Sequence, residues 1–262
     1  MNMAGFDVAD SGIVISPYHS YKHRYDAVLA VFMLIPGIPI ILFIMLLVKL
    51  TSKGPVLFFQ ERVGKNGKHF TLYKIRTMRV DAEADLGIVW ATKKDPRATS
   101  VGKVLRGLHL DELPQLFNVL RGDMALVGPR PERPEFVEIL TREIPGYSLR
   151  LLVTPGITGY SQLNLPADRN VNDVRRKLAL DSEYIEKASL WLDIRLILAT
   201  ICRVLRYTHK TLLKCLGVYQ KAETSPWAEF FQVPQNEAKQ EKVPVTQVSV
   251  VQLPQETGHD ES

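Results

Sequence analysis

The sequence has little cysteine. Only Cys202 and Cys215 occur among 262 residues, too few for a disulfide framework, and no zinc-type pattern of Cys and His surrounds them. We therefore expect the body of the protein to fold in a reducing compartment. Hydrophobic residues make up 46% of the chain and charged residues 23%, a balance that excludes collagen-like, coiled-coil and wholly disordered proteins.

Charge is missing altogether from residues 27–48. At about 1.5 Å per residue, this run is long enough to cross a hydrocarbon core of about 30 Å. Pro36 and Pro39 lie near its middle, and each removes a backbone donor and disfavours helix in the residue before it. The sequence therefore predicts a helix that breaks or kinks at these prolines.

Basic residues flank both ends of the apolar run, at Lys22, His23 and Arg24 and at Lys49 and Lys53. The positive-inside rule therefore gives a spanning helix no orientation and favours a re-entrant helix-break-helix hairpin with both ends on the cytoplasmic face. A kinked single span is the alternative. A cleavable signal peptide fits less well, because the run exceeds the usual 7 to 15 residues and no small-x-small site follows.

Acidic residues are scarce just after the apolar run. Residues 53–106 contain 12 Lys and Arg but 5 Asp and Glu, and the net charge of +5 suits nucleic acid, anionic lipid or phosphorylated small molecules. Asn66-Gly67 predicts a type I′ turn between strands near 56–59 and 70–76. Because side chains alternate between the two faces of a strand, Lys74 and Arg76 are expected on one face. There they could bind phosphate or form a solvated edge.

An acidic pair, Asp111 and Glu112, precedes an amphipathic helical pattern at Leu113, Leu116, Phe117 and Leu120. The pattern predicts Asp111 at the N-cap, Pro114 in the first turn and Gly122 at the end of the helix. Two adjacent carboxylates cannot face the same atom, so one could attack an electrophile while the other holds a divalent metal. A capping aspartate followed by a dipole-stabilising glutamate is the simpler alternative.

Arg130 lies between Pro129 and Pro131. Two prolines fix the backbone around the guanidinium, which suits bidentate phosphate binding, although a salt-bridged structural loop is equally consistent. A second Pro/Gly-rich turn follows at 153–160, then a helical stretch from about Asn172 to Tyr207. After about Val233 the composition predicts a disordered tail.

Taken together, residues 22–200 resemble the bacterial sugar transferase family, the monotopic phosphoglycosyl transferases that act on polyprenol phosphate. The order and spacing of several short motifs carry this resemblance. They are Lys22–Asp26, Gly54-Pro55-Val56, Gln60–Gly64, Lys74–Met78, Asp95-Pro96-Arg97, Leu110–Leu116, Gly128–Pro131, Thr154–Gly159 and Ser189–Asp193.

The resemblance implies that the chain transfers a sugar 1-phosphate from a UDP-sugar to undecaprenyl phosphate and releases UMP. It implies Asp111 as the nucleophile and Glu112 as the Mg²⁺ ligand. Four cations, Lys74, Arg76, Arg106 and Arg130, are candidates for binding phosphate. The implied site lies on the cytoplasmic face of the bacterial inner membrane, in contact with the bilayer, and a homodimer is left open.

The expected fold class is α+β: a re-entrant membrane helix-break-helix hairpin with a small cytosolic domain of helices and a β-hairpin. The expected segments are an N-terminal stretch (1–21), the membrane helix (22–50), the transferase domain (51–207), a variable C-terminal segment (208–232) and a disordered tail (233–262).

Three positions depart from the family pattern: His23 in the first basic motif, His109 before the acidic pair, and Leu165-Pro166 in place of Gly-Arg after Asn164. A membrane-anchored basic adaptor without catalysis is the alternative function, and it would not need Asp111 or Glu112. Nucleic-acid binding is not expected, because the cations are not interleaved with exposed aromatics in a known module.

Overall fold

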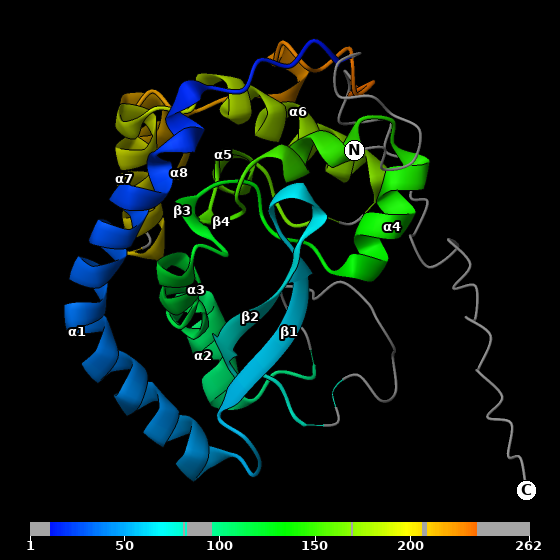
Figure 1. Cartoon of the computed structure of the whole chain (residues 1–262). Coiled ribbons are helices and arrows are strands. Elements are labelled where there is room, and N and C mark those ends of the chain that lie inside the picture. Colours follow the sequence, from blue (N-terminus) through cyan, green and yellow to red (C-terminus); the bar gives the residue numbers. More distant parts are fainter. Residues whose placement is uncertain (1–10, 81, 83–95, 169, 206–208, 235–262) are drawn as a thin grey trace, which may run out of the picture.

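The computed structural model describes residues 11–80, 82, 96–168, 170–205 and 209–234. The first ten residues, Asp95 of the Asp-Pro-Arg motif and the expected tail from residue 235 lie outside these ranges. The described chain mixes helices with two small sheets and carries one long apolar helix near its N-terminus. Figure 1 shows this helix, α1, along one side of the molecule.

Of the break or kink predicted in the apolar helix, a break is not seen and a bend is. Helix α1 runs without interruption over Lys22–Thr51, with Pro36 and Pro39 inside it, and in Figure 1 it bends about half-way along. Proline interrupts the hydrogen bonding of a helix locally and can kink it without ending it. A buried stripe continues across the bend and packs both halves on the body of the protein, which accounts for the continuity. The stripe is Lys22, Asp26, Ala30, Leu34, Gly37, Ile41, Ile44 and Val48.

The opposite face of α1 is apolar and exposed. By length and composition α1 is able to cross a membrane, and among the described residues it is the one helix that meets this criterion. Its exposed large side chains include Val31, Phe32, Ile35, Leu42, Phe43 and Leu46. A contiguous apolar face of this length marks a surface that contacts lipid or another apolar partner.

The predicted β-hairpin is present. Strands β1 (Leu57–Val63) and β2 (His69–Ile75) pair antiparallel. Asn66 and Gly67 both have positive φ, 56° and 75°, as the turn prediction requires, but they belong to a five-residue connection that contains the short 3₁₀ turn η3 (Lys65–Gly67).

The acidic pair lies between two helices, α2 (Ser100–Gly107) and α3 (Gln115–Arg121), in a separate 3₁₀ turn, η4 (Leu110–Glu112). The expectation that Asp111 caps the following helix is therefore wrong, because Pro114 holds that position. Proline pre-sets helical φ and needs no amide partner, so α3 starts there and frees the acidic turn for other contacts. Gly122 ends α3 with φ 83°, as predicted.

A second, unpredicted sheet consists of two short parallel strands, β3 (Ala125–Val127) and β4 (Gly156–Thr158). Two glycines let the loops beside these strands touch: a β-carbon on Gly156 would lie 2.0 Å from the Gly128 nitrogen. Three-residue strands carry too little periodicity to be detected in the sequence. Between β3 and β4 the chain forms α4 (Pro134–Glu143) and the 3₁₀ segment η5 (Tyr147–Leu152).

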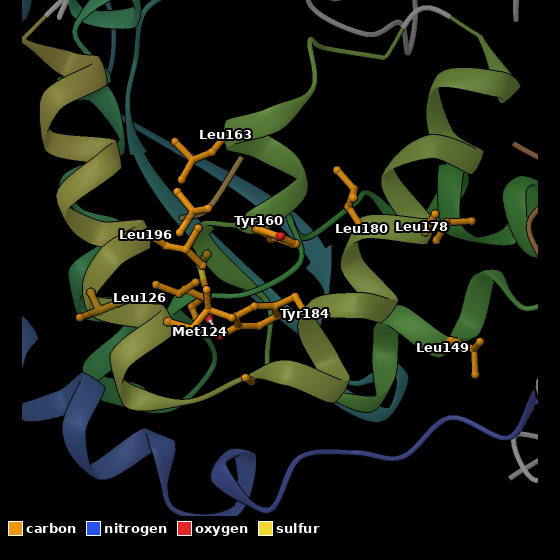
Figure 2. Close-up of a cluster of buried hydrophobic side chains, with 14 of the residues drawn as sticks. Met124, Leu126, Leu149, Tyr160, Leu163, Leu178, Leu180, Tyr184 and Leu196 are labelled. Carbon is orange, nitrogen blue, oxygen red and sulfur yellow. Dashed lines mark hydrogen bonds between the residues drawn. The ribbon is translucent and has the colours of Figure 1, made fainter. Parts of the chain in front are cut away.

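The helices that follow are α5 (Tyr160–Asn164), α6 (Val171–Lys187), α7 (Leu190–Val204) and α8 (His209–Cys215), followed by the 3₁₀ turn η6 (Ala222–Thr224). These helices pack on one another, and α7 also contacts the second sheet. The single helical stretch expected over 172–207 is divided, because Ser189 caps a new helix by accepting a hydrogen bond from Leu192 N. Figure 2 shows part of the core, with Tyr184 of α6 beside Met124.

A buried polar cluster fixes the start of α1 to the body. The Lys22 ammonium contacts Asp193 of α7 and also lies 3.0 Å from Asp26. Two tyrosine hydroxyls complete the cluster by donating to Asp193, Tyr184 at 2.7 Å and Tyr18 at 3.0 Å. Tyr18 belongs to the 3₁₀ turn η2 (Pro17–Ser20), just before α1. The carboxylate of Asp193 is thus the common acceptor for three donors.

Replacing Asp193 with alanine should destabilise the protein by about 3–5 kcal/mol, because it leaves a buried ammonium with one carboxylate and the Tyr18 hydroxyl without its acceptor. Tyr184 keeps Val127 O as an acceptor at 3.2 Å. Glu138→Ala is the control, since its pair with Arg142 is exposed and should cost about 0.5 kcal/mol or less. Denaturant unfolding in detergent measures both, and equal losses would contradict the assignment.

Candidate active site

The chain reverses direction at His109, directly before the turn that carries Asp111 and Glu112. His109 has φ 54°, in the left-handed region, and histidine is among the non-glycine residues enriched there. The flanking residues Leu110 and Leu113 pack on a small cluster formed by Ile44, Val48, Ile75 and Leu105. The acidic pair therefore lies next to the second half of α1.

Glu112 is held between two cations from different parts of the chain. Its Oε1 accepts a hydrogen bond from Lys74 Nζ at 2.9 Å and another from Arg130 Nη2 at 2.8 Å. Lys74 comes from β2 and Arg130 from the loop after β3. Asn118 holds α3 on β2 by accepting from Tyr73 N and donating to Thr71 O. This places the acidic turn over the end of the strand that carries Lys74.

Two further arginines fix the backbone of the Arg130 loop. Arg150 donates to Arg130 O at 3.0 Å, and Arg62 donates to Pro131 O at 2.9 Å. Arg150 also pairs with the buried Asp181 at 3.1 Å. The guanidinium of Arg130 therefore projects from a loop that the surrounding structure holds in one conformation.

The neighbouring carboxyls have opposite pKa shifts. Burial, helped by the negative charge of Glu112, raises the pKa of Asp111 above its ordinary value. Burial opposes ionisation of Glu112 too, but Arg130 and Lys74 outweigh it and hold the pKa of Glu112 far below its ordinary value. The two cations thus favour the ionised form of Glu112, whereas Asp111 is a poorly solvated carboxyl whose charge, when it is ionised, is only partly compensated.

Of the four predicted phosphate-binding cations, the structure brings Lys74 and Arg130 together at Glu112. Arg76 lies elsewhere: its guanidinium donates to the carbonyls of Lys53 and Ser52 and to the Ser52 hydroxyl, at the C-terminal end of α1. Arg106 is half-buried in α2, and among the described residues its side chain has no hydrogen bond or ion pair.

Residues beyond the predicted set also belong to the site. A small pocket beside Lys74 and Arg130 is lined by Arg62, Leu72, Gln115 and Pro131, and Gln162 of α5 accepts from Arg130 Nη1 at 3.4 Å. The alternation of the hairpin, with Arg62 and Lys74 on one face, could have indicated Arg62. No local pattern could have indicated Gln162, which reaches Arg130 from 32 positions away.

Within the described ranges, no group of three or more His, Cys, Asp or Glu side chains is arranged to hold a metal ion. A Mg²⁺ ion bound with a nucleotide needs less, because phosphates and water supply most of its ligands and one or two carboxylates suffice. The ionised Glu112 provides one such carboxylate and leaves Asp111 beside it free of that role, so the residues present fit this mode of binding.

The comparisons with known proteins identify the family of the chain. A profile described as bacterial sugar transferase matches residues 17–207, and the chain belongs to this family. It is 44% identical over 191 residues to a UDP-N-acetylgalactosamine-undecaprenyl-phosphate N-acetylgalactosaminephosphotransferase of Aeromonas hydrophila, covering 72% of this chain and 45% of the relative.

Two other relatives carry related names. An undecaprenyl-phosphate glucose phosphotransferase of Komagataeibacter xylinus is 43% identical over 70% of this chain and 35% of its own. A UDP-glucose:undecaprenyl-phosphate glucose-1-phosphate transferase of Caulobacter vibrioides is 39% identical over 69% of this chain and 68% of its own. The chain thus matches less than half the length of the Aeromonas and Komagataeibacter relatives.

The isosteric change Asp111→Asn should stabilise the protein at neutral pH, because it removes a buried charge. A carboxyl whose pKa is raised by folding destabilises the fold once it ionises, so stability is lost as pH rises through that pKa. The gain should therefore shrink as pH falls and disappear below about pH 3, where the aspartate is protonated in both states. Thermal unfolding of both proteins from pH 3 to 8 checks this, and a destabilised variant at pH 7 would contradict it.

Proposed function

We propose that the protein transfers a sugar 1-phosphate from a UDP-sugar to undecaprenyl phosphate and releases UMP, through a covalent intermediate on Asp111. The observation that carries the proposal is the Asp111–Glu112 turn itself, which contacts the two cations Lys74 and Arg130 and is packed on α1. The names of the relatives support the donor and acceptor classes.

In the first half-reaction, an Asp111 carboxylate oxygen attacks the β-phosphorus of the UDP-sugar. A bond forms between that oxygen and phosphorus, the bond from phosphorus to the bridging oxygen breaks, and its electron pair leaves with UMP. In the second, a phosphate oxygen of undecaprenyl phosphate attacks the same phosphorus and displaces the Asp111 carboxylate. The product is a lipid diphosphate sugar, and the enzyme regains its free carboxylate.

An anionic nucleophile can approach an anionic diphosphate only where positive charge lowers the repulsion. Lys74 and Arg130 supply that charge beside Asp111, and each has N–H donors beyond those used on Glu112 that can bind phosphate oxygens. Glu112 would hold Mg²⁺, which neutralises the diphosphate and improves UMP as a leaving group. The low pKa of Glu112 keeps it ionised for this role.

We further propose that α1 enters and leaves the inner membrane on the cytoplasmic side, with the body on that face. The buried stripe supports this: from Lys22 to Val48 it packs against the body along almost the whole helix. If α1 crossed the bilayer fully, the polar body would have to enter the hydrocarbon with it. Helix α7 adds Trp191, Leu198 and Ile201, which are also exposed.

Single cysteines at Ser20 and Lys53, introduced after replacing Cys202 and Cys215 with serine, test this topology. Both are expected to react with a membrane-impermeant maleimide only in inverted vesicles, because both ends of α1 then lie on the cytoplasmic side. Labelling of one of them from the periplasmic side in intact spheroplasts would show that α1 spans the membrane.

The transferase activity is tested with purified protein, Mg²⁺, undecaprenyl phosphate and a panel of UDP-sugars, following UMP. Asp111→Asn should lower UMP release by about 10³-fold or more, as expected when a nucleophile is lost. Asp123→Asn is the matched control, because Asp123 follows α3 and pairs with Arg121 at its surface. Chelation of Mg²⁺ should abolish release reversibly.

Each outcome decides between functions. Release that continues unchanged in Asp111→Asn would rule out the covalent mechanism. No release from the wild type with any donor would favour the membrane-anchored adaptor, for which Asp111 and Glu112 are dispensable.

A further inference from the structure

Helix α5 is in contact with the Arg130 loop at two points. Gln162 Oε1 accepts from Arg130 Nη1 at 3.4 Å, and Gly159, which precedes α5, lies so close that a β-carbon there would be 2.3 Å from Gly128 O. A displacement of α5 would therefore move both the side chain and the backbone of the loop that carries Arg130.

The Gln162 contact is not explained by stability. The side-chain nitrogen Nε2 is buried and has no hydrogen-bond partner among the described residues, and an unsatisfied buried donor is destabilising. The oxygen faces Arg130, whose Nη2 binds Glu112. Two acceptors on two nitrogens of a planar guanidinium fix its plane, and a neutral amide does so without cancelling its charge.

Five residues are too few for a helix to be stable alone, so α5 depends on its surroundings. Asn164, at its C-terminal end, joins it to the segment after α8. Asn164 Nδ2 donates to Val218 O at 3.0 Å, and Asn164 Oδ1 accepts from Gln220 N at 2.9 Å. On the other side, Arg203 of α7 donates to Gln162 O at 2.7 Å.

The segment that Asn164 binds, residues 209–234, lies beyond the part of the chain that matches the family. It is nevertheless part of the body. Its buried side chains include Leu213, Val218, Ala222, Trp227 and Phe231. Polar contacts tie it to the helices beneath: Ser225 donates to Ala179 O of α6, and Arg195 of α7 donates to Leu216 O.

We propose that residues 209–234 hold α5 in place and that α5, through Gln162, orients Arg130 for the diphosphate of the donor. Gln162 and Asn164 are then positioning residues, which act on the substrate through Arg130. The proposal rests on the transferase function. It makes that function depend on residues 209–234, which lie outside the part of the chain that matches the family.

Three variants test it. Gln162→Ala and Asn164→Ala should each lower kcat/KM for the UDP-sugar about tenfold, the size of a lost contact to a charged group. Because both act through the same link, the double variant should fall little further than either single variant. Ser225→Ala is the control: it breaks a contact of the same segment away from α5, so it should lower the melting temperature and leave kcat/KM unchanged.

If the decreases in kcat/KM of the two single variants multiply in the double variant, Gln162 and Asn164 act independently and the proposed link between them is overturned. An unchanged kcat/KM in Asn164→Ala would overturn it too. If kcat/KM falls as much in Ser225→Ala as in Asn164→Ala, the effect is explained by general destabilisation and the proposal is overturned.

Amide hydrogen exchange provides a readout that needs no turnover. In Asn164→Ala, exchange in residues 125–132 should become at least about fivefold faster than in the wild type and in Ser225→Ala, because that loop packs against α5. Unchanged exchange would overturn the proposal even if the enzyme is active. Faster exchange in Asn164→Ala, combined with no UMP release from the wild type, would retain the mechanical link and reject only the transferase function.

Discussion

The double ion pair at Glu112 is the interaction on which the rest of the site depends. It joins the hairpin, the acidic turn and the proline-flanked loop through one carboxylate oxygen, which Lys74 and Arg130 both contact. A buried carboxylate is costly unless cations and hydrogen bonds compensate it. The elements that carry those cations must therefore dock together, and the positive charge is concentrated beside Asp111.

Asp111 lies next to this compensated carboxylate and lacks equivalent compensation. Burial and the charge of Glu112 raise the pKa of Asp111. Ionised Asp111 therefore lowers the stability of the folded protein. Such a group is more reactive toward an electrophile than a fully solvated carboxylate, and the same property destabilises the free protein. The opposite shifts in two adjacent residues follow from which of them the cations contact.

The sequence predicted features that depend on local chemistry and missed those set by packing. The hairpin, the positive φ values at Asn66 and Gly67 and the end of α3 at Gly122 all follow from residue type, and all are present. The break at Pro36 did not appear, because contacts along the stripe hold the helix together. The contact between Gln162 and Arg130 joins residues distant in sequence, and single-sequence patterns carry no information about such pairs.

The cluster around Asp193 has a consequence for biosynthesis. Lys22 and Asp193 are separated by 171 positions, so the ribosome has made the whole of α1 long before its partner exists. Until then Lys22 has only Asp26, one turn away, at the entrance of a very apolar helix. The contact between Lys22 and Asp193 therefore forms late in synthesis. In a nascent chain that does not yet include α7, Lys22 at the polar end of α1 lacks this partner.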